Sequence, residues 1–227
     1  MNFREPLPGA LFRSAQPFAS CWPGALEQLR GVRSIVDFRG AAERVPGEWD
    51  RVPGCVVHHL PLDVTGVIPP METGADLGAF YVRMAEGAPG VIAAAAEIVA
   101  FQGPVLVHCA AGKDRTGLFV ALLLDLRGVP RQEIVADYVA TAAALPDIFR
   151  ELAAGHASVT ALNEGAAGQA GVEALRERLA KIPPPLLHAP AEAITAFLAT
   201  IGSRHGGAEK FLLRCGVSPA AIAAIRG

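Results

Sequence analysis

Apolar residues in the first 140 positions form short runs that alternate with helix-spaced sets. The short runs predict strands near residues 11–13, 34–38, 55–60 and 105–107. Between them, a helix is expected from Pro23 to Gly31, and helical structure over 80–101 with an interruption at 87–90. Residues 63–78 hold glycines and two prolines without periodic apolar positions, and we interpret them as a loop.

From residue 118 onward the pattern is helical. Leu118–Leu126 is apolar on nearly every side, which predicts a buried helix, and an amphipathic helix follows Pro130. Further helices are predicted near 147–153, 172–181, 191–203, 207–214 and 219–225. The fold class is therefore α/β, with a central, mostly parallel sheet of about four to five strands flanked by helices and a helical C-terminal extension.

The chain is expected to be one domain, with an α/β core at 1–140 and C-terminal helices at 191–227. The segment 141–190 is too long for a simple connection between neighbouring helices. As a hypothesis, it forms a helical lid over the site.

Composition narrows the functional classes. The chain has 227 residues, 52% of them hydrophobic, and a net charge of −2, which disfavours a nucleic-acid binder. No apolar run approaches the roughly 20 residues of a membrane helix, and the first residues do not resemble an export signal. The four cysteines are far apart and lack metal-ligand spacing. We expect a cytoplasmic protein with reduced thiols and no metal or cofactor.

The sequence HCAAGKDRTG at residues 108–117 follows a buried strand and leads into a buried helix. Ligands bind at such strand ends in α/β sheets, and backbone N–H groups with the helix dipole favour an anion. Ala110, Ala111 and Gly112 leave that backbone accessible, and a guanidinium at Arg115 matches phosphate oxygens. Lys113 adds a second positive charge. We predict a phosphate loop at residues 108–116.

The same field stabilises a thiolate, so Cys109 is predicted to be a nucleophile that needs no histidine base. Thr116 is expected to donate its hydroxyl to the sulfur, and His108 to point away and hold the loop by hydrogen bonds. Asp37 and Arg39 either orient the loop or form a buried ion pair that braces their strand.

Two other interpretations of the motif are disfavoured. A lone cysteine is usually a small core residue and Lys-Asp-Arg a solvated turn, but their coincidence with His108, Thr116 and two glycines argues against chance. A Walker-type nucleotide loop does not fit, because Asp114 follows Lys113 and Val107 stands where a glycine is required.

The ten-residue motif resembles the signature of bacterial cysteine-dependent protein tyrosine phosphatases, a family with tyrosine, dual-specificity and lipid phosphatases. Further similar segments lie at 2–4, 11–15, 35–39 with Glu43, 128–130, 136–138 with Thr141, and 193–215. The resemblance implies a two-step, metal-independent hydrolysis in which Cys109 attacks phosphorus, Arg115 holds the phosphoryl oxygens and a carboxylic acid protonates the leaving oxygen.

Two carboxylates are candidates for that acid. Asp63 follows a strand, where many phosphatases of the superfamily carry the acid on a mobile loop. Asp114 lies inside the motif, and the resemblance suggests this role for it. Its cationic neighbours favour the charged form, whereas a bound phosphate dianion has the opposite effect. We favour Asp114 and leave Asp63 open.

The leading substrate is a phosphorylated protein carrying phosphotyrosine, with inorganic phosphate as product. Phosphoinositide or dual-specificity hydrolysis is the alternative, and Lys113 suits either. Aromatic walls for phosphotyrosine could come from Phe38, Phe80, Tyr81 or Phe119. A sulfur-transfer enzyme and an inactive phosphate-binding module are the two competing classes.

Overall fold

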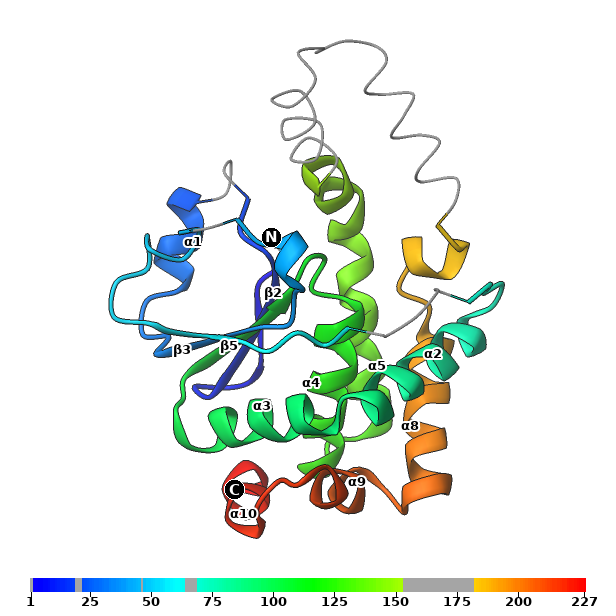
Figure 1. Ribbon diagram of the computed structural model, residues 1–227. Helices are drawn as coiled ribbons and strands as arrows, with labels where there is room; N and C mark the ends of the chain where they lie inside the picture. Colours follow the sequence, from blue (N-terminus) through cyan, green and yellow to red (C-terminus); the bar gives the residue numbers. More distant parts are fainter. Residues whose placement is uncertain (1, 19–21, 46, 64–68, 153–181) are drawn as a thin grey trace, which may run out of the picture.

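A five-stranded sheet forms the centre of the computed structural model, which describes residues 2–18, 22–45, 47–63, 69–152 and 182–227 (Figure 1). Its strand order is β1-β2-β5-β3-β4. The strands are β1 Arg4–Leu7, β2 Leu11–Ala15, β3 Ser34–Asp37, β4 Val56–His59 and β5 Val105–Cys109. All pair in parallel except β1, which pairs antiparallel with β2. The predicted α/β class and its four strands are confirmed.

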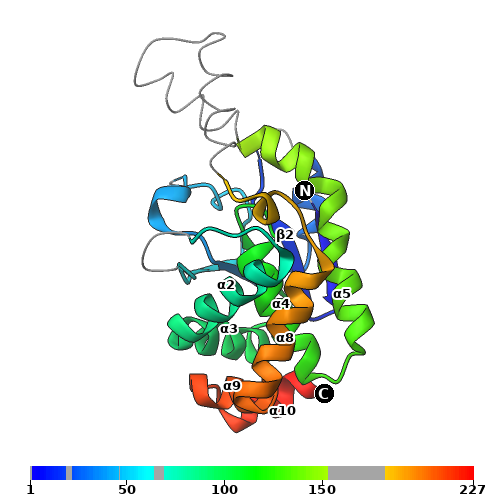
Figure 2. The ribbon, with the colours of Figure 1, turned by 90° about the vertical axis from the view of Figure 1, so that its right-hand side faces the viewer.

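Helices cover both faces of this sheet. They are α1 Trp22–Gln28, α2 Gly74–Gly87, α3 Pro89–Phe101, α4 Asp114–Leu126, α5 Arg131–Val139, α8 Ala191–His205, α9 Ala208–Cys215 and α10 Pro219–Arg226. Short 3-10 helices span Ala41–Glu43, Ala140–Ala144 and Pro184–Leu187, and residues 145–152 are helical. Figure 2 shows α8 beside α2 and α5, with α9 and α10 at its end. The helix expected at 172–181 lies outside the described residues.

The sheet divides the apolar side chains into two cores. Val36, Val105 and Val107 contact the larger core, which the helices from α2 onward complete. Ile35 and Leu106 point to the opposite face, where α1 and residues 49–52 cover them. Strand β5 is thus buried on both faces, as its unbroken apolar run predicts, and its carboxyl end is held between β2 and β3.

The predicted loop at 63–78 is wrong at its carboxyl end, because α2 begins at Gly74. The Thr73 hydroxyl accepts a hydrogen bond from the Asp76 N–H at 3.1 Å, and the Asp76 carboxylate accepts from the Thr73 N–H at 2.9 Å. This reciprocal pair starts a helix although a glycine and two prolines precede it in the segment.

The buried helix predicted at 118–126 begins earlier, at Asp114. A carboxylate in the first turn interacts favourably with the amino-terminal end of the helix dipole. The predicted phosphate loop therefore comprises the end of β5, the turn at 110–113 and the first residues of α4. Strand β1, near the amino terminus, was not predicted by the sequence pattern.

No single helix in the described ranges has both the length and the hydropathy of a membrane span. Helices α2 and α3 reach this length and hydropathy only when taken together, and the chain bends by 83° between the two helices.

Candidate active site

Cys109 is the last residue of the central strand and is only 2% exposed. It pairs in register with Ala15 of β2, and the Gln16 N–H donates to the Ala110 carbonyl at 3.1 Å. Gly112 has φ +65°, and a Cβ there would lie 2.3 Å from the Ser14 carbonyl oxygen. Only glycine fits this turn, which keeps the backbone after Cys109 tightly against β2.

The side chain of Arg13 supports the turn at residues 110–113 by a hydrogen bond to its backbone. Its Nη2 donates to the Gly112 carbonyl at 2.8 Å, and its Nη1 binds Asp137, which Arg4 also contacts. Burial lowers the pKa of Arg13 to about 10, still well above neutrality. Its contact with Gly112 shows that Arg13 braces the predicted phosphate loop directly.

Arg115 is held by a carboxylate from a distant segment. Its Nη1 and Nη2 donate to the two oxygens of Glu43 at 2.6 and 2.7 Å, and Nη1 also contacts the Phe38 carbonyl at 3.3 Å. Burial opposes the charge of Arg115, but the Glu43 hydrogen bonds and the nearby Cys109 outweigh it and raise the pKa. Arg115 is therefore a permanent cation, and no described residue accepts from its Nε.

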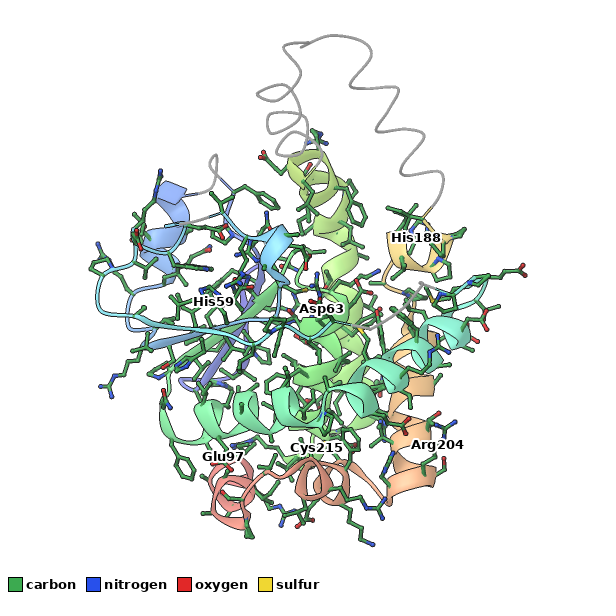
Figure 3. The ribbon with its side chains drawn as sticks, in the orientation of Figure 1. His59, Asp63, Glu97, His188, Arg204 and Cys215 are labelled. Carbon is green, nitrogen blue, oxygen red and sulfur yellow. The ribbon has the colours of Figure 1, made fainter. Side chains whose placement is uncertain are left out.

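Lys113 lies in a different environment from the one expected. Its side chain is fully buried, and Nζ donates to the carbonyls of Leu186 at 2.5 Å and His188 at 2.7 Å. His188 is labelled in Figure 3 next to the 3-10 helix Pro184–Leu187. The ammonium group thus binds the segment that precedes α8, and its predicted contact with phosphate remains a prediction.

One carboxylate oxygen of Asp114 has two polar partners. Tyr81 donates to Oδ1 at 2.5 Å, and Lys113 Nζ lies 3.2 Å from the same atom. The Tyr81 and Tyr138 hydroxyls are 2.7 Å apart. Burial, together with the charge of Asp114, raises the pKa of both tyrosines, so both hydroxyls keep their protons. The sequence analysis named Tyr81 only as a candidate aromatic wall and did not predict its pairing with Tyr138 at the site.

Asp63, the other candidate acid, contacts the Arg115 guanidinium. Its Oδ1 is 3.5 Å from Arg115 Nη1, and its side chain is 52% exposed. Asp63 is labelled in Figure 3. A Cβ on Gly40 would lie 2.7 Å from Asp63 Oδ2, so glycine permits this approach. Both candidate acids therefore neighbour the predicted phosphate loop.

His108, Asp37 and Arg39 form a fully buried cluster at the ends of β5 and β3. The Asp37 carboxylate accepts three hydrogen bonds from Arg39, at 2.9 to 3.0 Å. His108 Nδ1 lies 3.3 Å from the Cys109 carbonyl and Nε2 lies 3.5 Å from Asp37. Burial lowers the pKa of His108 to about 4, so the ring is neutral at physiological pH. The cluster is a buried ion pair that also contacts the loop through His108.

Thr116 is fully buried, and its Oγ1 has no hydrogen-bond partner among the described residues. The expected bond to the Cys109 sulfur is not formed in this structure. A buried hydroxyl without a partner is costly, which marks Thr116 as a group that a thiolate or ligand would satisfy.

The four aromatic residues expected to line a phosphotyrosine pocket are not exposed. Phe38, Tyr81 and Phe119 are fully buried and Phe80 is 6% exposed. Phe38 packs edge-on against Phe119, with ring centroids 5.2 Å apart. These side chains belong to the larger core, because α4 packs against the sheet and α2 packs against α4.

A family model described as the tyrosine phosphatase family matches residues 6–227. The chain belongs to this tyrosine phosphatase family. Within it, the chain is similar to the "Triple specificity protein phosphatase PtpB" of Mycobacterium tuberculosis, at 31% identity over 124 residues, 55% of this chain and 43% of that protein. It is also similar to a "Tyrosine-protein phosphatase" of Nostoc commune, at 62% identity over 40 residues, 18% of this chain and 14% of that protein.

The chain therefore spans less than half the length of each of these two relatives. Among solved structures, the core catalytic domain of the PP-IP phosphatase SIW14 from S. cerevisiae superposes with a TM-score of 0.46. The sequence identity to it is 21%, and the match covers 63% of this chain and 76% of that one.

Proposed function

We propose that this member of the tyrosine phosphatase family hydrolyses phosphomonoesters through a phosphocysteine intermediate, with phosphotyrosine as its leading substrate. The observation that carries the proposal is the placement of Cys109 and Arg115 at the two ends of one tight turn. Gly112 and Arg13 support that turn, and Glu43 keeps the guanidinium oriented and charged.

In the first step, the Cys109 thiolate attacks phosphorus and forms an S–P bond. The P–O bond to the leaving group breaks, and the leaving oxygen keeps the electron pair and takes a proton from a carboxylic acid. Arg115 and the N–H groups of the loop stabilise the charge on the phosphoryl oxygens.

In the second step, water attacks phosphorus and gives its proton to the same carboxylate. The S–P bond breaks, which returns the electron pair to the sulfur and releases inorganic phosphate. We assign the acid to Asp114, because its carboxylate belongs to the first turn of α4 and one of its oxygens is already oriented by a hydrogen bond from Tyr81.

Phosphoinositide or dual-specificity hydrolysis is the alternative, and the mycobacterial relative, a triple specificity protein phosphatase by name, supports a broad specificity. The position of Lys113 favours phosphotyrosine instead. Its ammonium group already donates to two carbonyls and lies 3.2 Å from Asp114 Oδ1, so it has no N–H donor left for a second phosphate in this state. A thiolate nucleophile must stay reduced, and the proposal therefore places the enzyme in a reducing compartment such as the cytoplasm.

The test is hydrolysis of para-nitrophenyl phosphate in EDTA by the native chain and by Cys109→Ser. Turnover that survives chelation and is lost in the variant supports the proposal, and a panel of phosphotyrosine peptides and phosphoinositides then ranks the substrates. A native chain that is folded and reduced but inactive would favour a binding module or sulfur chemistry. Activity that persists in the variant would exclude Cys109 as the nucleophile.

A further inference from the structure

Two buried tyrosines from different helices meet at the first residue of α4. Tyr81 comes from α2 and Tyr138 from α5, and both are 1% exposed or less. Their hydroxyls are 2.7 Å apart, and the Tyr81 hydroxyl is 2.5 Å from Asp114 Oδ1. A chain of polar groups thus runs through the apolar core and ends at the carboxylate beside the phosphate loop.

The direction of these hydrogen bonds follows from the number of protons. Each tyrosine has one hydroxyl proton, and burial raises the pKa of both. With Asp114 ionised, Tyr81 donates to Oδ1, so the bond between the two hydroxyls must be donated by Tyr138. The Lys113 ammonium, 3.2 Å away, is a second partner of Oδ1 and carries a positive charge.

The two oxygens of Asp114 are therefore not equivalent. Oδ1 has Tyr81 and Lys113 as partners, whereas Oδ2 has no hydrogen-bond donor among the described residues. A proton added to Oδ1 would displace one of these partners, and a buried donor without an acceptor is unfavourable. A proton on Oδ2 costs no existing bond.

We propose that Tyr81, supported by Tyr138, is a positioning residue for proton transfer by Asp114. Its hydrogen bond holds Oδ1 in the core and leaves Oδ2 to carry the transferred proton. In the transfer, the Oδ2–H bond breaks and an O–H bond forms on the leaving oxygen, while the carboxylate charge remains beside Tyr81 and Lys113. This inference rests on the proposed phosphatase activity and on Asp114 as its acid.

The test compares Tyr81→Phe with the native chain on two substrates. Phenyl phosphate has a poor leaving group that needs a proton, and 2,4-dinitrophenyl phosphate has a good one that does not. We expect kcat/KM on phenyl phosphate, which reports the steps up to P–O cleavage, to fall about 10- to 100-fold, less than removal of the acid itself would cost. On the dinitrophenyl ester the fall should be less than about threefold, because proton transfer contributes little there.

The chain offers a matched control and a second variant. Phe197 packs on the Tyr81 ring, with centroids 6.3 Å apart, and has no hydroxyl. Phe197→Leu should therefore change the rates of hydrolysis of both substrates by the same factor. Tyr138→Phe removes only the outer hydroxyl, and a smaller loss confined to phenyl phosphate is expected. This variant keeps the test decisive if Tyr81→Phe does not fold.

Equal losses on the two esters in both tyrosine variants, or no loss, would overturn the proposal. Asp114→Asn is measured beside them. If it shows no loss confined to phenyl phosphate, Asp114 is not the acid and the role of Tyr81 falls with it, while a Cys109-dependent phosphatase activity still stands. A native chain that hydrolyses neither ester overturns both the activity and the inference.

Discussion

The Arg115 guanidinium and the Glu43 carboxylate form two parallel hydrogen bonds, from Nη1 to Oε2 at 2.6 Å and from Nη2 to Oε1 at 2.7 Å. They are separated by 72 residues in the sequence. The pair uses the end of the guanidinium and leaves Nε free of described acceptors. Glu43 therefore orients Arg115 so that its remaining edge can bind an anion.

Replacing Glu43 by Gln should weaken phosphate binding without removing the activity. The amide accepts fewer charge-assisted hydrogen bonds, so Arg115 is held less firmly, and the inhibition constant for inorganic phosphate should rise about tenfold. Glu48→Gln is the control, since Glu48 binds Arg39 and not Arg115. Tighter phosphate binding in Glu43→Gln would instead show that Glu43 competes with phosphate.

Gly112→Ala should destabilise the chain strongly. Gly112 has φ +65°, and the new Cβ would lie 2.3 Å from the Ser14 carbonyl oxygen, which cannot move without disturbing β2. Gly128→Ala is the matched control, because Gly128 has φ +74° with nothing within 4 Å of an added Cβ. In denaturant unfolding, Gly112→Ala should cost at least about 2 kcal/mol more than the control. Equal costs would mean that the turn adapts to the methyl group.

His108 should make stability depend on pH in a defined window. Burial lowers its pKa from the ordinary histidine value of 6.5 to about 4, so the unfolded chain binds a proton that the folded chain does not. The free energy of unfolding should therefore decrease as the pH falls from about 6.5 to about 4, by up to about 3 kcal/mol. The stabilising contribution of the Asp37 carboxylate is lost only below this window. Burial raises its pKa, but the hydrogen bonds from Arg39 outweigh burial and lower the pKa from 3.8.

His108→Gln removes this titration and keeps a polar side chain. Denaturant unfolding across the window should then show a flatter pH dependence than that of the native chain. If the two chains have the same slope, other groups carry the pH dependence and His108 is not buried as a neutral ring.

Asp114→Asn and Asp63→Asn distinguish the two candidate acids. Loss of the acid should reduce the rate on phenyl phosphate by about 10²–10⁴ and leave good leaving groups much less affected. We expect this selective loss in Asp114→Asn only. The reverse pattern would assign the acid to Asp63, whose exposed carboxylate lies 3.5 Å from Arg115.

Local patterns predicted most of the fold. The unbroken apolar run of β5 and the nearly all-apolar α4 are buried as expected. Strand β1 was missed because its sequence, REPL, has no strand pattern of its own and is stabilised by pairing with β2. The start of α2 could have been found, since Thr73 and Asp76 have the spacing of a capping box.

The hydrogen-bond partners of the predicted site residues could not be predicted from local patterns. Cys109 and Arg115 are assigned by the motif, which is local, but the hydrogen bonds of Arg115, Lys113 and Asp114 come from residues 72, 73 and 33 positions away. Such contacts depend on how α2, the 3-10 helices and the sheet pack together. The sequence therefore predicted a charged loop, and the structure shows that Lys113 and Asp114 also bind the surrounding core.

The most direct test of the proposed phosphocysteine mechanism is to identify the residue that carries the phosphoryl group during turnover. The native chain is mixed with para-nitrophenyl phosphate, quenched within one turnover, digested and analysed by mass spectrometry, with Cys109→Ser treated in parallel. We predict a phosphoryl group on the peptide that contains Cys109, bound through sulfur, and none at that position in the inactive variant. A phosphoryl group on another residue, or product release by an active native chain without any phosphorylated peptide, would contradict it.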